Sequence, residues 1–226
     1  MIYIYPFRTA ANGFIFAEIP YLNSDQIKLS KTLSRSSFSG KPSQIYGVTE
    51  EQLAAEAEED ANPPPPPEED EEPAPPPVRP VRVTELQRLA YTVKLIDQET
   101  SIVPAGAYIL TETGAVIPDS TFRGLSYTDS LTKSAYLHFR PATDPAKLRT
   151  IAGDAATYQS QFLDSIDDDT PAGCWVVRTD AGANATILRS LLWPGYSAYH
   201  IPGTSSFGGA YFGPGNRNSD LAFLLF

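Results

Sequence analysis

Cysteine and histidine are scarce in this chain of 226 residues, which holds one cysteine, Cys174, and two histidines, His138 and His200. A lone cysteine cannot form a disulfide within the chain, so no internal disulfide is expected. Cys174 lies beside Trp175 in a β-like run, and this position favours a buried small hydrophobic residue over a reactive thiol. The histidines are more than sixty residues apart, without the close spacing of zinc ligands. Each is expected to be a hydrogen-bonded or half-exposed sheet residue.

Long apolar runs are missing as well. No stretch reaches the roughly 18 apolar residues that a membrane-spanning helix needs. Residues 1–6 lack the basic start and the apolar core of a signal peptide. We therefore expect an intracellular, soluble protein.

Basic residues are absent from positions 50–77, where eleven acidic residues gather: Glu50, Glu51, Glu56, Glu58, Glu59, Asp60, Glu68, Glu69, Asp70, Glu71 and Glu72. The net charge of −10 arises from this segment, because the remainder holds 17 basic and 16 acidic residues. A nearly neutral body without a cluster of Lys and Arg argues against nucleic acid as the partner.

The acidic segment is also rich in proline, at residues 63–67 and 75–77. Such a sequence cannot recover the entropy lost on ordering, so residues 50–80 are expected to form a disordered Glu/Pro-rich insert. Residues 50–60 could form a short acidic helix before the prolines impose an extended conformation. A solvated spacer is favoured over the alternative of a ligand for an SH3 or WW domain.

The rest of the chain predicts an α+β fold with a mainly antiparallel β-sheet and a few short helices. Apolar residues at helical spacing predict a helix that begins after Thr84 and another over residues 155–166. Ser126 as a cap, with Asp129 near the positive end, predicts a helix that starts over residues 126–131. Short runs bounded by Gly and Pro predict strands at 93–96, 101–103, 108–110, 116–118, 136–139, 174–178, 185–192, 196–201, 210–212 and 221–226.

An N-terminal β-hairpin is predicted at residues 2–5 and 14–16, across an Asn-Gly turn at 12–13. Its strands are too short to be stable alone in water, so the region 1–49 is expected to pack on the main fold. The insert follows at 50–80, and the α+β core domain occupies residues 81–226.

The sequence Trp193-Pro194-Gly195 predicts a tight turn between two strands. A type II turn after Pro194 requires a positive φ at Gly195. Trp193 follows two leucines at the end of a strand, so its ring is expected to cover the apolar face of the sheet. This corner should therefore be essential to folding.

Acidic residues between positions 164 and 169 invite comparison with a calcium-binding EF-hand loop: Asp164, Asp167, Asp168 and Asp169. Ile166 occupies a position that needs an oxygen ligand, and the glutamate that ends such loops is missing. An acidic turn without metal is therefore expected.

The glycine-rich stretch at 208–215 lacks the Lys-Ser/Thr pair of a phosphate-binding loop, and a strand-like run follows it instead of a helix. We predict no catalytic residues, no cofactor and no metal site. The alternative is an enzymatic or small-ligand domain whose site is assembled from His138, Asp164 and His200.

Three blocks of sequence carry a resemblance to a known family. The first is LRSLLWPG at residues 188–195, followed by Tyr-x-x-Tyr-His-x-Pro and by Tyr-Phe-Gly-x-Gly at 211–215. The others are the segments at 102–108, 122–126 and 134–140, and FLDSI at 162–166 with PAGCW at 171–175. In this order and spacing, residues 85–226 resemble the radial spoke head protein 9 family of ciliary and flagellar axonemes.

The resemblance implies a structural, non-catalytic subunit of the radial spoke head that is needed for spoke head assembly and for regulation of axonemal motility. It implies the cytoplasm, the cytoskeleton and the axoneme of the cilium or flagellum as the location. The partners that it implies are radial spoke head proteins 1, 4, 6 and 10 and the spoke stalk, with neither nucleic acid nor membrane among them.

Overall fold

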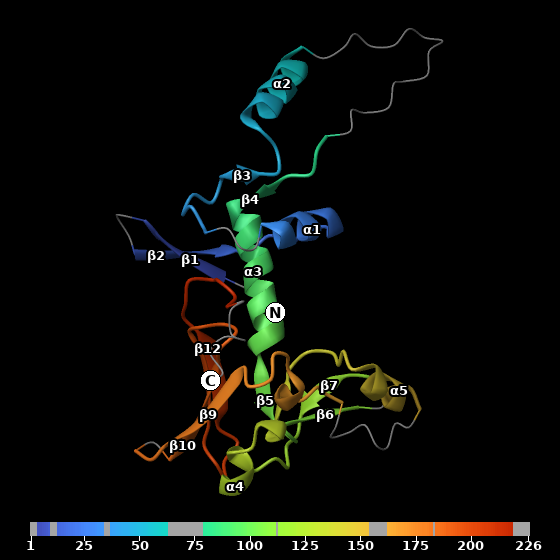
Figure 1. Cartoon of the computed structure of the whole chain (residues 1–226), viewed down its shortest axis with the longest axis vertical. Coiled ribbons are helices and arrows are strands. Elements are labelled where there is room, and N and C mark those ends of the chain that lie inside the picture. Colours follow the sequence, from blue (N-terminus) through green and yellow to red (C-terminus); the bar gives the residue numbers. More distant parts are fainter. Residues whose placement is uncertain are drawn as a thin grey trace. The chain divides into compact units, whose positions relative to one another are not determined.

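Short helices alternate with antiparallel strand pairs, so the computed structural model confirms the α+β fold expected from the sequence (Figure 1). The structure describes residues 4–9, 13–33, 37–62, 79–111, 113–153, 162–182 and 184–218. In these ranges no helix is both long and apolar enough to cross a lipid bilayer. Contacts divide the chain into two units, Met1–Val93 and Lys94–Phe226, and the boundary falls within helix α3 (Glu85–Thr100).

The first unit begins with the predicted hairpin, in which β1 (Ile4–Thr9) pairs antiparallel with β2 (Gly13–Glu18). The expected turn residue Asn12 lies outside the described residues. Helix α1 (Ser24–Thr32) follows, and Asn23 begins it because its side chain accepts hydrogen bonds from the first turn. The packing of residues 1–49 on the core domain stays a prediction.

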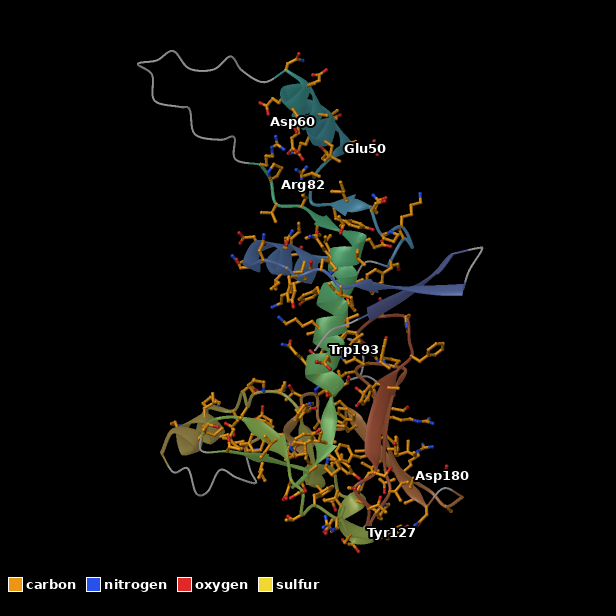
Figure 2. All side chains as sticks on the ribbon, turned by 180° about the vertical axis from the view of Figure 1, so that it is seen from behind. Glu50, Asp60, Arg82, Tyr127, Asp180 and Trp193 are labelled. Atoms are coloured by element: carbon orange, nitrogen blue, oxygen red, sulfur yellow. The ribbon has the colours of Figure 1, made fainter. Side chains whose placement is uncertain are left out.

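The acidic segment begins with a helix, α2 (Glu50–Ala61), which the side chain of Thr49 caps. Two ion pairs connect this helix to the chain that follows the prolines: Arg82 with Glu56 at 2.6 Å, and Arg79 with Asp60 at 2.5 Å (Figure 2). Residues 63–78, the rest of the predicted disordered insert, lie outside the described residues. Strands β3 (Ile45–Tyr46) and β4 (Val83–Thr84) pair on either side of the segment.

Helix α3 begins after Thr84, as predicted, and the Oγ1 of this residue accepts a hydrogen bond from the N–H of Gln87. The helix also includes residues 93–96, for which the sequence predicted a strand, so that prediction is wrong. The reason is that Leu89, Val93 and Ile96 continue the helical spacing of apolar residues, and neither Gly nor Pro interrupts the segment before Thr100.

The second unit contains a four-stranded antiparallel sheet in the order β12-β11-β10-β9. Its strands are β9 (Trp175–Asp180), β10 (Ala185–Ser190), β11 (Tyr196–His200) and β12 (Phe207–Tyr211). Alternate residues of β11 are buried and exposed, so one face of the sheet forms the core and the other contacts solvent. The predicted strand at 221–226 lies outside the described residues.

Two smaller strand pairs complete the second unit: β5 (Ile102–Pro104) with β8 (Tyr136–His138), and β6 (Tyr108–Leu110) with β7 (Val116–Pro118). Helix α4 (Tyr127–Ser130) begins after Ser126, whose side chain accepts from Asp129 N–H, as predicted. A 3₁₀ turn, η1 (Lys133–Ala135), leads into β8.

The helix predicted over residues 155–166 is wrong at its described end. Residues 162–165 are not helical, Ser165 forms an isolated β-bridge with Leu137 of β8, and Ile166–Asp168 is a 3₁₀ turn, η2. Pairing with β8 and burial of Phe162 and Leu163 outweigh the helical spacing there. Residues 154–161 lie outside the described residues, and an unpredicted helix, α5 (Pro145–Gly153), precedes them.

The core of the second unit packs the inner face of the sheet against the end of α3 and against β5 and β8. Its buried members are Ile96, Ile102, Tyr136, Ile166, Cys174, Trp175, Leu188, Leu192, Trp193, Tyr196 and Ala198. Burial and the nearby Asp169 carboxylate raise the pKa of Cys174 to about 11, so its thiol is protonated at neutral pH. The prediction of a buried cysteine is confirmed.

Candidate functional site

The corner at Trp193-Pro194-Gly195 is built on a buried indole. Trp193 is 2% exposed, and its Nε1 donates a hydrogen bond to Oε2 of Glu99 at 2.8 Å. Gly195 has a φ of +106°, as the turn prediction required. A Cβ at this position would lie 2.2 Å from the backbone oxygen of Phe212, so only glycine fits.

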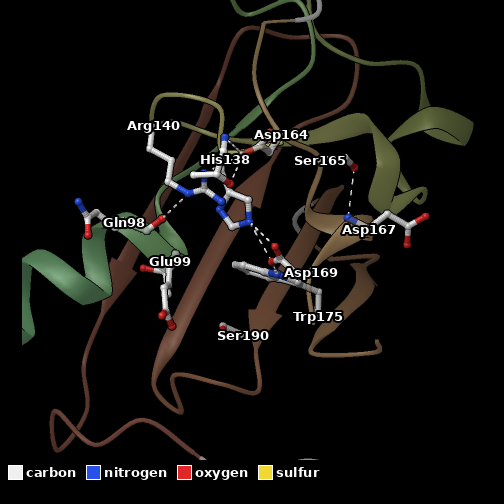
Figure 3. A network of polar contacts seen from close by, with 12 residues as sticks. Gln98, Glu99, His138, Arg140, Asp164, Ser165, Asp167, Asp169, Trp175 and Ser190 are labelled. Carbon is white, nitrogen blue, oxygen red and sulfur yellow. Dashed lines mark hydrogen bonds and ion pairs between the residues drawn. The ribbon is translucent and has the colours of Figure 1, made fainter. Parts of the chain in front are cut away.

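A second buried arrangement joins His138, Asp169 and Trp175 (Figure 3). The Nε2 of His138 lies 2.8 Å from Oδ2 of Asp169, and the indole Nε1 of Trp175 donates to the same oxygen at 2.7 Å. The rings of His138 and Trp175 meet edge to face, with their centroids 6.3 Å apart. The carboxylate therefore holds two aromatic side chains from different strands in fixed orientations.

Asp164 has a different set of partners. Its Oδ2 accepts hydrogen bonds from Nη1 of Arg140 at 2.7 Å and from the N–H of Thr143 at 2.8 Å. Burial alone would raise the pKa of Asp164, but the hydrogen bonds from Thr143 and Arg140 outweigh it and lower the pKa below the ordinary value. The Nε of Arg140 donates to the backbone oxygen of Gln98, so Arg140 connects the Asp164 carboxylate with the end of α3.

His200 lies in yet another environment, fully buried on the inner face of the sheet. Its Nε2 accepts a hydrogen bond from the N–H of Leu125 at 3.1 Å, so this nitrogen carries no proton. The ring meets Tyr136 edge to face, with a centroid separation of 6.4 Å. Burial lowers the pKa of His200, which keeps the ring neutral at physiological pH.

The three residues of the alternative site, His138, Asp164 and His200, do not converge. A backbone hydrogen bond of 2.9 Å joins the N–H of His138 to the oxygen of Asp164, but the three side chains share no hydrogen-bond partner. Two hollows among the described residues, of about 370 and 170 Å³, are lined by other side chains. In the structure, His138, Asp164 and His200 each form hydrogen bonds that connect neighbouring elements of the fold.

The acidic residues between 164 and 169 likewise point to separate partners. Asp164 pairs with Arg140, Asp169 with His138, and Asp167 with Lys133 at 3.5 Å. Over the part of the chain that the structure covers, no three His, Cys, Asp or Glu side chains are close enough to hold a metal ion.

Sequence reasoning missed the carboxylates of Asp169 and Glu99 as connecting residues. Asp169 precedes its partner Trp175 by six positions, whereas Glu99 and Trp193 are 94 positions apart. The spacing of Glu99 and Trp193 along the chain gives no sign of their contact, because the two residues meet only in the folded core. For the pair of Asp169 and Trp175, the sequence signal is an acidic residue shortly before a strand that begins with an aromatic residue.

The fold and these networks define an α+β protein whose buried polar groups serve to connect its elements. No family model matches the chain. Proteins named radial spoke head protein 9 homolog do match it. The one from Xenopus tropicalis is 40% identical over 143 residues, the one from Homo sapiens 38% over 146, and the one from Danio rerio 34% over 188.

These alignments cover 63%, 64% and 83% of this chain, in the same order. They cover 52%, 52% and 63% of the relatives, so the chain spans about half the length of the frog and human proteins. The resemblance to the radial spoke head protein 9 family is confirmed at the level of sequence.

Proposed function

We propose that this chain is a structural, non-catalytic component of the radial spoke head in motile cilia or flagella. The observation that carries the proposal is that curated relatives at 34–40% identity share the name radial spoke head protein 9 homolog. In this role the chain helps the spoke head to assemble and contributes to the regulation of axonemal motility. Its location is the cytoskeleton of the cilium, reached from the cytoplasm.

The internal arrangement of the second unit supports a structural role. The carboxylates of Glu99, Asp164 and Asp169 each accept a hydrogen bond from a side chain of the same unit. These carboxylates therefore stabilise the fold. A core whose elements are joined by such hydrogen bonds suits a structural subunit of the spoke.

The exposed aromatic side chains support contacts with other proteins. Tyr21 and Phe212 are each 93% exposed, and Tyr127 is 57% exposed. Aromatic residues are enriched in protein interfaces because they bury a large area at a low cost in conformational entropy. The partners that we propose are radial spoke head proteins 1, 4, 6 and 10 and the spoke stalk.

Fractionation of axonemes tests this function. A tagged chain is expressed in motile ciliated cells, and the detergent-resistant axonemes are separated from the soluble matrix. We expect the chain in the axonemal fraction, and after extraction by salt it should sediment with other spoke head proteins. A chain found only in the soluble matrix would contradict the proposal.

A matched pair of variants sharpens the experiment. Phe212→Ala removes a side chain that is almost wholly exposed, so it should leave the fold intact and weaken recovery with the spoke head. Leu148→Ala removes an apolar side chain that is 46% exposed on α5, and it serves as the control for loss of surface apolar area.

A further inference from the structure

The solvent face of the four-stranded sheet carries an open hollow of about 370 Å³ along β9 and β10. We call it the arginine hollow, and the residues that matter in it are Val176, Arg178, Asp180, Gly182, Ile187 and Arg189. The hollow lies on the opposite face of the sheet from the buried residues Trp175, Leu188 and Ser190.

The strand register places two arginines diagonally across this hollow. Arg178 is opposite Ile187, and Arg189 is opposite Val176. Residues directly opposite each other in an antiparallel pair project from the same face, so all four side chains project toward solvent. Two guanidinium groups therefore flank a floor of two branched aliphatic side chains.

Neither of these guanidinium groups is neutralised within the described part of the chain. Arg178 and Arg189 are exposed, and the structure gives them neither a carboxylate partner nor a hydrogen bond there. By contrast, Arg140 pairs with Asp164, and Arg217 pairs with Glu99. Two arginines without a carboxylate partner among the described residues thus flank one apolar floor.

We propose that the arginine hollow is a docking surface for an extended, glutamate- or aspartate-rich segment of another protein. The planar guanidinium group binds a carboxylate through two parallel hydrogen bonds. Alternate residues of an extended chain project from the same side, about 7 Å apart, which suits two arginines on neighbouring strands. Val176 and Ile187 would contact the aliphatic parts of the bound segment.

The position of β9 supports an extended partner. β9 ends the strand order of the four-stranded sheet, and the hollow runs along it. A strand at the edge of a sheet can accept a further chain by backbone hydrogen bonds, while side-chain contacts supply specificity. Tyr199 is directly opposite Ile187 on β11 and 42% exposed, so it extends the apolar floor toward the centre of the sheet.

Charge also sets the limits of the site. Asp180 is the acidic residue that lines the hollow, and it lies near the outer end of the β9–β10 hairpin (Figure 2). Its Oδ1 accepts a hydrogen bond from the N–H of Gly182 at 2.9 Å. Outside residues 50–77 the chain holds 17 basic and 16 acidic residues, without the cluster of Lys and Arg that a densely charged polyanion such as RNA requires. A segment with spaced carboxylates, neutral where it passes Asp180, fits these groups better.

The arginine hollow does not depend on the presence of the chain in axonemes. The test uses the full chain and a fluorescein-labelled decapeptide of alternating Glu and Ala, with a Gln-Ala decapeptide of equal length as the reference ligand. Fluorescence anisotropy gives the affinity at low and at physiological salt. We expect binding of the acidic peptide that weakens with salt, and no binding of the Gln-Ala peptide.

The double variant R178Q/R189Q should lower the affinity by at least about tenfold and should flatten its dependence on salt. Both side chains are exposed, so its melting temperature should match that of the parent chain. The control is Arg149→Gln, which changes an exposed arginine on α5 whose Nε donates to the backbone oxygen of Pro145. This variant should bind the acidic peptide like the parent chain.

Three results would each overturn the proposal. One is equal affinity of the double variant and the parent chain for the acidic peptide. Another is equal affinity of the parent chain for the Glu-Ala and Gln-Ala peptides, which includes the case that neither peptide binds. The third is tighter binding of a single-stranded RNA oligonucleotide than of the Glu-Ala peptide under the same conditions.

Discussion

The indole Nε1 of Trp193 and the carboxylate of Glu99 are joined by a hydrogen bond of 2.8 Å across 94 positions of the sequence. The Nε of Arg217 donates to the same oxygen, also at 2.8 Å. The ring of Tyr211 meets the indole edge to face, with the centroids 6.3 Å apart. The hydrogen bond between Trp193 and Glu99 attaches the turn after β10 to the end of helix α3. Loss of the indole would therefore remove a contact of both elements.

Replacement of Trp193 by alanine should therefore destabilise the protein strongly. The loss of a buried Trp side chain costs about 3–5 kcal/mol, a large part of a typical domain stability of about 5–15 kcal/mol. Urea unfolding measures the change. Trp193→Phe keeps a ring but removes the N–H, and it should cost less. A change below about 1 kcal/mol for Trp193→Ala would show that the corner is not part of the core.

Glycine at position 195 should be required for two reasons, the positive φ of its backbone and the lack of space for a Cβ. A comparison with Gly203 separates these two contributions. Both residues have positive φ, but a Cβ at Gly203 would meet nothing within 4 Å, whereas at Gly195 it would meet Phe212 O at 2.2 Å. Gly203→Ala should cost about 1–2 kcal/mol from the backbone conformation alone. Gly195→Ala should cost clearly more by urea unfolding, and equal costs would remove the steric argument.

Asp164 should make the stability depend on acid. Its pKa is lowered in the folded protein, so its contribution is present above the pKa of the unfolded state, about 3.9, and is lost as the pH falls through the folded value. Asp164→Asn should lower the unfolding free energy at pH 7 and flatten its decline below about pH 4. The control is the exposed Asp168→Asn, and urea unfolding at a series of pH values compares them. An unchanged acid profile in Asp164→Asn would contradict this.

His200 should add a second dependence at milder pH. Burial lowers its pKa in the folded state, so the unfolded chain binds a proton first as the pH falls below about 6.5, and the folded state loses stability there. His200→Gln keeps an acceptor for the N–H of Leu125 and cannot be protonated. The variant should lose less stability than the parent chain between pH 7.5 and 5.5, measured by urea unfolding; equal losses would refute the assignment.

Cleavage within residues 63–78 should leave the two parts of the first unit associated. The carboxylate of Glu85 accepts hydrogen bonds from the N–H groups of Ser39 and Gly40 at 2.7 and 2.6 Å and from the Tyr46 hydroxyl at 2.8 Å. After digestion with a glutamate-specific protease, the fragments should elute together in size exclusion. Glu85→Gln removes the charge of this acceptor and should promote their separation. Separation of the parent fragments would contradict the expectation.

Features set by neighbouring residues were predictable from the sequence. The caps at Thr84 and Ser126 and the positive φ of Gly195 depend on local chemistry. The strand predicted at 93–96 failed, as did the described end, residues 162–166, of the helix predicted at 155–166. Short apolar segments fit either structure, and packing against distant elements decides between them.

The buried networks were out of reach for the same reason. The partners of Asp169 and Glu99 come together only when strands and helices from different parts of the chain pack. Sequence alone placed the histidines correctly in sheet strands, but it gave no means of pairing His138 with Asp169 or His200 with Leu125.

The order of strands in the four-stranded sheet has a consequence for how the second unit folds. Each strand from β9 to β12 pairs with its neighbour in the sequence, so the sheet's own contacts span short loops. Such local pairings form quickly, whereas the contact between Trp193 and Glu99 must close a loop of 94 positions. We therefore expect the sheet to assemble first, and the docking of α3 on it to set the rate at which the native core appears.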